Sequence, residues 1–312
     1  MCGLRRDSRQ LCDTLAVVEI DPEVWSEHRS YLMAVAYRLL GTVSEAEDVV
    51  QEAYLRMRRY EGIEIVEVRR WLTTVVSRIC LDHLRSARAR RERYLGIWLP
   101  EPLVGADSQP GPDDRAVLRE SVQTALLIVL ESLTPAERTA FVLHDVFDVS
   151  FDDIGEVVGR SAPACRQLAS RARARLRRRV PRFDVSVAER ELVVRAFMTA
   201  TIEGDLHGLV TALDPAVVFR SDGGGVVPAA RGEVRGRDDV ARLVRGLAEH
   251  YSRATVRLEL VNAAPGVVME LDGAVLAVAS ITVTSGMVAA IDVVLNPEKL
   301  RHVNLASLHE PR

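Results

Sequence analysis

A proline- and glycine-rich stretch from residue 94 to residue 115 interrupts the helical part of this chain and reads as a linker, not a helix. It holds four prolines and three glycines within 22 residues, and both residue types interrupt helices. Patterns typical of helices lie on either side of it. Fully extended, the stretch spans about 73 to 79 Å. We therefore expect two helical domains, at 22–93 and 116–180, joined by a linker that lets them reach well-separated positions on a partner.

The first helical domain contains a helix with an acidic outer face. Apolar residues recur at i, i+3 and i+4 between Ala46 and Met57, which predicts an amphipathic helix. Its outward positions include Asp48, Gln51 and Glu52. A face of this kind suits a basic protein surface, although a merely solvated face is the alternative.

Helix boundaries in this domain are predicted from capping residues. Ser44 and Glu47 have the spacing of a capping box, so we expect Ser44 to begin the acidic helix. Gly41 is expected to end the helix before it. A further helix, rich in arginine, is predicted at about 67–92.

The second helical domain has the pattern of a helix-turn-helix. Ser150 is expected to cap a short helix that Gly159 closes, and Ser161 to cap a long basic helix from Ala162. The outward residues of its first half are candidates for contact with base edges in a DNA groove: Arg166, Gln167, Ser170 and Arg171. The arginines from Arg173 to Arg179 are expected to meet phosphates.

The charge is strongly patterned although the chain is nearly neutral. Forty-one basic and 44 acidic residues give a net charge of -3, which excludes a uniformly basic nucleic-acid coat. Residues 77–93 nevertheless hold six arginines against two acids, and residues 160–182 hold nine arginines and no acid. We expect nucleic acid as one partner and a basic protein surface as another. A solvated basic face remains the alternative for residues 77–93 taken alone.

The cysteine spacing and the hydropathy lead us to expect a cytoplasmic protein. We expect no bound metal and no cofactor. The four cysteines, at positions 2, 12, 80 and 165, have neither zinc-site spacing nor the density of a disulfide framework. No stretch of about 18 apolar residues occurs, and no signal peptide is recognisable. We therefore expect free thiols in a reducing compartment and no membrane association.

The residues after Pro181 predict a third domain of the α+β class, at 184–312. Two helices lead to a strand at 216–222 and a helix at 237–251, and four strands follow. We expect the sheet to be antiparallel. Five scattered residues are candidate acid or base groups for an enzyme, although such residues are more often surface or capping groups: His207, His250, Asp222, Asp272 and Asp292.

Three motifs in the helical half resemble the extracytoplasmic-function sigma factors of bacteria. The run RLLG (38–41) followed by EAEDVVQEAYLR (45–56) resembles the family's helix that docks on the RNA polymerase clamp. The run RWLTTVVSRICLDHLR (70–85) resembles its promoter −10 helix. The run LTPAER (133–138), with Ile154-Gly155 and the basic helix, is similar to its −35 reader. The resemblance covers residues 25–180.

The resemblance implies two all-α domains, sigma region 2 at 22–93 and sigma region 4 at 116–180, and roles for named residues. Core polymerase is expected to be bound by Asp48, Gln51 and Glu52. The −10 element is expected to meet Arg78, Arg85, Arg88, Arg90 and Arg91. The −35 element is expected to meet Arg166, Gln167, Ser170, Arg171 and Arg173. The loop at 62–67 lies where the family captures an unstacked base, with Tyr60 as its aromatic neighbour.

The third domain resembles the SnoaL-like branch of the NTF2-like fold, a cone-shaped sheet around a cavity. Three motifs resemble the sigma-factor subgroup that carries this domain as a fused regulator. One is in the linker, at Trp98, Leu99, Pro100, Glu101 and Pro102. The second is Asp222, Gly223, Gly224 and Gly225, and the third is at Asn296, Pro297, Lys299 and Leu300. We expect these motifs to contact or support one another, whereas Trp98 packing against its own N-terminal domain is the alternative.

The sequence therefore predicts a sigma factor that brings core RNA polymerase to promoter DNA, performs no covalent chemistry, and is tuned by its C-terminal domain, whose cavity could take an unidentified small ligand. Two alternatives stay open. One is a conventional helix-turn-helix regulator, and the other is an enzyme or ligand-binding SnoaL-like domain localised by its N-terminal half.

Overall fold

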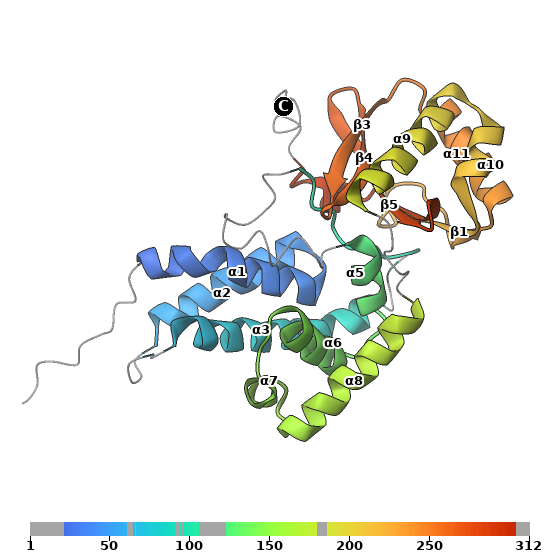
Figure 1. Ribbon diagram of the computed structural model, residues 1–312. Coiled ribbons are helices and arrows are strands. Elements are labelled where there is room, and N and C mark those ends of the chain that lie inside the picture. Colours follow the sequence, from blue (N-terminus) through green and yellow to red (C-terminus); the bar gives the residue numbers. More distant parts are fainter. Residues whose placement is uncertain are drawn as a thin grey trace, which may run out of the picture.

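The computed structural model describes residues 22–60, 65, 67–91, 94, 96–105, 123–179 and 186–303 of the 312-residue chain, without the side chains of 22–24, 87–91 and 179. The described residues form three domains (Figure 1). Two are helical, and the third combines helices with one sheet. In the part of the chain that is described, no helix is long and apolar enough to cross a membrane.

The first domain, the N-terminal bundle, packs three helices together. These are α1 (Pro22–Leu40), α2 (Val43–Arg58) and α3 (Val68–Arg91). Gly41 separates α1 from α2 with a φ of 78°, a left-handed conformation that glycine adopts without strain. The apolar stripe of α2 is buried as predicted, from Ala46 to Met57.

The helix α2 begins differently from the prediction. Its first residue is Val43, and no capping bond is made by the side chain of Thr42, which precedes it. The predicted capping box of Ser44 and Glu47 is therefore wrong. The first amides of the helix, at Val43 and Ser44, donate instead to the carboxylate of Glu101, 2.7 and 3.4 Å away. A residue in the distant linker does what a local side chain was expected to do.

The second domain is a helix-turn-helix domain of five segments. These are α5 (Thr124–Leu130), α6 (Pro135–Phe141), the π-helical turn η1 (Val142–Val146), α7 (Phe151–Val158) and α8 (Ala162–Arg179). Ser150 caps α7 by accepting from the Asp153 amide, and Gly159 ends it with a φ of 73°, both as predicted. The buried stripe of α8 includes Cys165, Ala169 and Ala172.

The C-terminal domain places three helices beside a six-stranded sheet. The helices are α9 (Val187–Glu203), α10 (Leu206–Ala212) and α11 (Arg237–His250), and a one-turn helix, α12 (Pro297–Leu300), follows the last strand. The strands are β1 (Leu213–Asp222), β2 (Val234–Arg235), β3 (Thr255–Val261), β4 (Ala264–Leu271), β5 (Ala274–Thr284) and β6 (Met287–Val294). This α+β arrangement agrees with the SnoaL-like, NTF2-like expectation.

The sheet differs from the predicted antiparallel one because it is mixed. Its order is β2-β1-β6-β5-β4-β3, and β1 pairs with β6 in parallel. After β2 the chain crosses to the far edge of the sheet at β3, and the hairpins that follow bring β6 back beside β1. Hydrophobic alternation within a strand does not reveal which strand pairs with it. The sheet is also open, with β2 and β3 at its edges.

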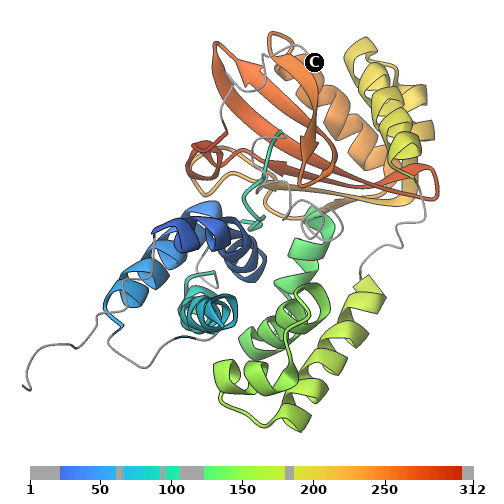
Figure 2. The same cartoon turned by 60° about the vertical axis from the view of Figure 1, so that its left-hand side comes forward.

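Two hydrophobic cores extend beyond a single domain. One continuous core contains residues of both the N-terminal bundle and the helix-turn-helix domain, such as Leu39, Leu72 and Leu143. A second core fills the C-terminal domain. A third, smaller core joins Leu99 of the linker to Val261 and Leu300. Figure 2 shows the linker lying between the N-terminal bundle and the sheet.

Candidate nucleic-acid and protein interfaces

The acidic face of α2 is open to solvent. Asp48, Gln51 and Glu52 are all exposed, and Glu52 forms an i,i+4 ion pair with Arg56 at 2.9 Å. None of the three is covered by another described domain. A protein partner could therefore reach this face without any change in the conformation of the chain.

The arginines of α3 lie in two different situations. Arg78 donates from Nη2 to the backbone oxygen of Glu156 in α7, over 3.0 Å. Arg85 is exposed and pairs with Asp82 at 3.0 Å on its own helix. The side chains of Arg88, Arg90 and Arg91 lie outside the described residues, as does most of the loop at 62–67. Only part of the predicted −10 surface is therefore described.

An aromatic pair stands beside that loop. The ring of Tyr60 lies 5.1 Å from the ring of Trp71, between centroids, and Tyr60 is exposed. The sequence indicated Tyr60 alone as the aromatic residue beside this loop, because Trp71 lies on the other side of the loop along the chain. The tilted pair offers a stacking surface of the kind that holds an unstacked base.

On α8, the predicted base readers Arg166, Gln167, Ser170 and Arg171 are exposed. Two of the arginines of this helix form ion pairs with one buried carboxylate of α6. Glu137 accepts from Arg171 Nε at 3.2 Å and from Arg175 Nη1 at 3.0 Å. Arg173 pairs with Asp145. Arg171, Arg173 and Arg175 are therefore each ion-paired within the helix-turn-helix domain.

Glu137 also closes the N-terminus of α6, where it forms a capping box with Thr134. Burial favours the neutral carboxylic acid, but the hydrogen bonds from Thr134 and the charges of the two arginines outweigh it. They hold the pKa of Glu137 below its usual value. The carboxylate is therefore charged at neutral pH and ties the start of α6 to α8.

The two helical domains are packed face to face. Arg70 of α3 forms an ion pair with Asp153 of α7, with Nε 2.8 Å from the carboxylate. Arg138 of α6 is buried, pairs with Glu131, and donates to the backbone oxygen of Arg38 at 3.4 Å. Together with the Arg78 contact, these bonds attach α3 to α7 and α1 to α6. In this conformation the two helical domains are in contact, so the reach that a fully extended linker would allow is not used.

The linker motif is held by one buried carboxylate of the C-terminal domain. Asp222, at the end of β1, accepts from the Leu99 amide at 2.8 Å and from Lys299 Nζ at 2.8 Å. Lys299 also donates to the Leu99 carbonyl, so both polar groups of that residue are engaged. Tyr94 donates to the other oxygen of Asp222 at 2.5 Å. We call Tyr94, Leu99, Asp222, Asn296 and Lys299 the latch.

The glycine run supports the latch. Gly224 has a φ of 65°, and a Cβ there would lie 2.5 Å from Nδ2 of Asn296, closer than any side chain allows. Asn296 in turn donates to the Tyr94 hydroxyl at 3.1 Å. The motif at 222–225 and the motif at 296–300 therefore meet at the same linker residues.

Trp98 contacts two domains at once. The Lys299 ammonium lies 4.1 Å from its ring centroid, a cation–π contact with the C-terminal domain. The same ring reaches Gly41, where a Cβ would lie 3.0 Å from it. Trp98 therefore packs against its own N-terminal domain and also contacts the C-terminal domain. Position 41 needs a glycine because the ring comes so close and because its φ is positive.

The central cavity of the C-terminal domain contains none of the candidate catalytic residues. Its volume is about 530 Å³, and none of the described residues that line it has an acidic, basic or histidine side chain. Asp222 belongs to the latch, and Asp292 faces Arg220 at 2.8 Å away from the cavity. His207, His250 and Asp272 are exposed. No arrangement of an acid and a base therefore faces this cavity.

Both helical domains match known protein families. The model of Sigma-70 region 2 matches residues 24–90, and that of Sigma-70, region 4 matches residues 123–176. The ECF RNA polymerase sigma factor SigJ of Mycobacterium tuberculosis (strain ATCC 25618 / H37Rv) is 44% identical over 283 residues, which cover 87% of this chain and 90% of SigJ. The chain belongs to the ECF sigma factors.

Two further comparisons extend the likeness over the C-terminal domain. The probable ECF sigma factor SigI of the same strain is 38% identical over 279 residues, covering 88% of this sigma factor and 93% of SigI. The crystal structure of SigJ matches with a TM-score of 0.73 at 40% identity, covering 90% of this chain and 98% of that one. The prediction of a transcription initiation factor is confirmed, and the helix-turn-helix regulator is not favoured.

Sequence analysis of this sigma factor missed a polar junction built on Asn262. Asn262 is buried in the β3–β4 turn and adopts a φ of 50°. Its Oδ1 accepts from Tyr37 of α1 at 3.2 Å and from the Leu103 amide at 2.9 Å. Thr124 of α5 binds its Nδ2. An asparagine before alanine in a hairpin looks like an ordinary turn residue, so nothing local in the sequence marks it.

Proposed function

We propose that this sigma factor binds core RNA polymerase through the exposed face of Asp48, Gln51 and Glu52, and promoter DNA through α3 and α8. The acidic face supports the first assignment, because its charges are unpaired with any other domain. The outward arginines of α8 support the second. Since polymerase and promoter DNA share the cytoplasm, we place its action there.

We further propose that the structure is the closed form of the sigma factor, which must open before it binds a promoter. The observation that carries this proposal is the bond from Arg78 to Glu156. It uses a predicted −10 residue to hold the helix-turn-helix domain against α3. A sigma factor in which α3 is bonded to the helix-turn-helix domain through a predicted −10 residue cannot spread its −10 and −35 surfaces along one duplex.

The C-terminal domain acts in this proposal as a built-in regulator. Its latch holds Leu99, and the adjacent Glu101 caps α2, so the linker is fixed at both sides. A linker held in this way cannot extend to the roughly 3.3 to 3.6 Å per residue that separation of the helical domains would use. Release of the latch would free it. The domain needs no catalysis for this role, and its cavity lining offers no acid–base pair.

Transcription with purified core polymerase tests the proposal. The full chain is added to core enzyme and fragmented genomic DNA, and the transcript starts are mapped. Specific starts that depend on the chain are expected, whereas a conventional regulator would produce none without another sigma factor. A chain truncated after Phe183 is compared in parallel, with the distance between α3 and α7 followed by a fluorescent pair. Equal distances in both chains would contradict the closed form.

A further inference from the structure

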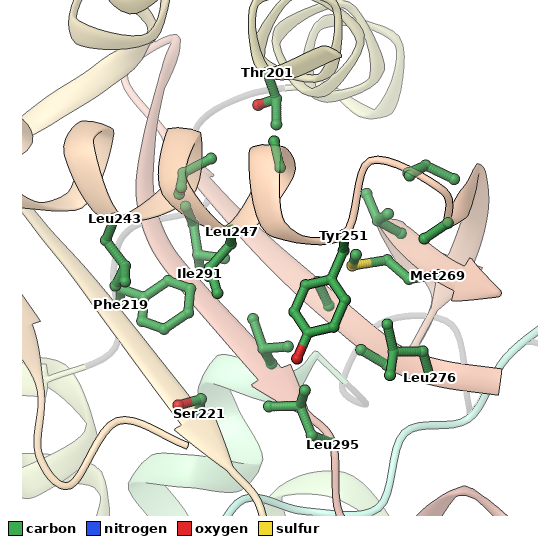
Figure 3. A pocket seen from close by; sticks show the side chains of 18 of the residues that line it. Thr201, Phe219, Ser221, Leu243, Leu247, Tyr251, Met269, Leu276, Ile291 and Leu295 are labelled. Atoms are coloured by element: carbon green, nitrogen blue, oxygen red, sulfur yellow. The ribbon is translucent and has the colours of Figure 1, made fainter. Parts of the chain in front are cut away.

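The cavity of the C-terminal domain has the size and lining of a small-molecule site. Its volume of about 530 Å³ lies within the range of about 300 to 1,000 Å³ found for ligand pockets. Side chains from α9, α11 and the sheet surround it, among them Phe219, Leu247 and Met269 (Figure 3). A folded domain gains stability by filling such space with its own side chains, so a large lined cavity indicates a use.

The lining determines the charge of the ligand. Among the residues that the structure describes, no acidic, basic or histidine side chain lines the cavity, so none of them would compensate the cost of taking an ion out of water. Aliphatic and aromatic groups form most of the wall. The molecule that fits is therefore uncharged and largely apolar.

Two hydroxyl groups mark one end of the cavity as polar. The Tyr251 hydroxyl points toward the end lined by Ser221 and Leu295 (Figure 3), and none of the residues that the structure describes forms a hydrogen bond with it. Ser221 Oγ accepts from the Ala230 amide at 2.8 Å and keeps its own hydrogen to donate. A ligand carrying one hydroxyl or carbonyl group would find its partners here.

That polar end is continuous with the latch. Ser221 and Leu295 line the cavity, and the next residue along the chain in each case is a latch residue, Asp222 or Asn296. The amides of Leu295 and Asn296 both donate to the Asp222 carbonyl, at 2.8 and 2.9 Å. A ligand in contact with Ser221 and Leu295 would therefore touch residues bonded directly to the part of the chain that holds Leu99.

We infer that this cavity binds an uncharged, apolar small molecule with one terminal hydrogen-bonding group, and that its binding alters the hold of the latch on the linker. The inference that a ligand binds here depends only on the size and lining of the cavity. The effect on the linker rests on the proposed function, in which the latch keeps the sigma factor closed. The ligand would thereby act as the signal that the C-terminal domain reads.

Binding is tested with N-phenyl-1-naphthylamine, an uncharged aromatic probe whose fluorescence rises in apolar surroundings. The full chain is expected to bind one equivalent. Ala248→Trp, which fills the cavity from α11, is expected to weaken binding at least tenfold. Glu249→Trp, on the exposed face of the same helix, is the matched control and should bind as the unaltered chain does. If Ala248→Trp unfolds, Ala229→Trp at the exposed rim replaces it.

Absence of probe binding, or equal binding by the cavity-filled and control variants, would overturn the site. The effect on the latch is measured separately, as hydrogen exchange of the Leu99 amide with and without saturating probe. A change in the unaltered chain that is lost in Ala248→Trp is expected. Probe binding without any change at Leu99 would overturn the coupling only. The closed form itself is judged by the distance between α3 and α7, so its failure is recognised independently.

Discussion

Asn262 donates a hydrogen bond from Nδ2 to Oγ1 of Thr124 over 2.8 Å, although the two residues are 138 positions apart. Thr124 lies in the helix-turn-helix domain, and the same amide group of Asn262 also meets Tyr37 of the N-terminal bundle. Ser280 of β5 lies 2.7 Å from the Thr124 hydroxyl. One buried side chain thus joins all three domains.

We expect Asn262→Ala to destabilise the closed form. The change removes the acceptor of the Leu103 amide, and an unsatisfied buried donor costs about 1 to 3 kcal/mol, whereas the Thr124 hydroxyl keeps its bond with Ser280. Asp272→Ala is the matched control, because Asp272 has a φ of 51° in the next hairpin but is exposed. Both variants bear the same backbone cost. Urea denaturation should therefore give a lower midpoint for Asn262→Ala, and equal midpoints would contradict the junction.

Reversal of the acidic face should weaken binding to core polymerase. In the double variant Asp48→Arg, Glu52→Arg, two attractive charges become repulsive toward a basic surface, whereas α2 loses only the pair of Glu52 with Arg56, about 0.5 kcal/mol. Fluorescence anisotropy with core enzyme measures the affinity. The control reverses Asp238 and Asp239 on α11. A core affinity that falls equally in both variants would reject the assignment.

The two kinds of arginine on α8 should respond differently to alanine. Arg171→Ala is expected to lose about 1 to 3 kcal/mol of binding and to relax the choice at one −35 position. Arg177→Ala should weaken binding evenly and lower the salt slope by about 1. Holoenzyme binding to a panel of −35 variants at several salt concentrations separates the two. Loss of sequence choice in both variants would show that the helix is oriented differently in the groove.

Asp222→Asn should loosen the linker. The substitution keeps the shape of the side chain but leaves Lys299 buried without its counter-charge, which costs about 3 to 5 kcal/mol. Hydrogen exchange at Leu99 should then accelerate roughly a hundredfold or more. Asp214→Asn, at the other end of β1, serves as the control. Protection of Leu99 that survives in Asp222→Asn would rule out Asp222 as the holding group.

Acid should weaken the helix-turn-helix domain through Glu137. Its pKa in the folded protein lies below the usual value, so the unfolded chain binds the proton more readily and the stabilisation is complete above the unfolded pKa, about 4.3. As the pH falls through the folded pKa, it disappears. Denaturation of the unaltered chain and of Glu137→Gln should therefore converge in acid and diverge toward neutral pH. Glu203→Gln is the control, and a constant difference would contradict this role.

Local patterns in the sequence determined most of the helical half. Thr134 and Ser150 accept from amides three residues away, and Gly159 donates to the carbonyl of Gly155, so their capping roles follow from spacing alone. The inward stripe of α8 follows from helical periodicity in the same way. The prediction at Ser44 failed for a physical reason, because the amides that needed an acceptor were reached first by Glu101, 57 positions away from Ser44.

The sequence by itself also indicated that three distant motifs belong together. The motifs at 98–102, 222–225 and 296–300 are far apart in the chain, but all three resemble motifs of the same sigma-factor subgroup. Only the tertiary structure decided which atoms meet. Asp222 meets Lys299 because β1 and β6 run parallel and bring their ends to the same place, and no local preference encodes that pairing. The uncharged cavity and the Asn262 junction arise likewise from residues far apart in sequence, whose individual types are ordinary and whose positions in space are not.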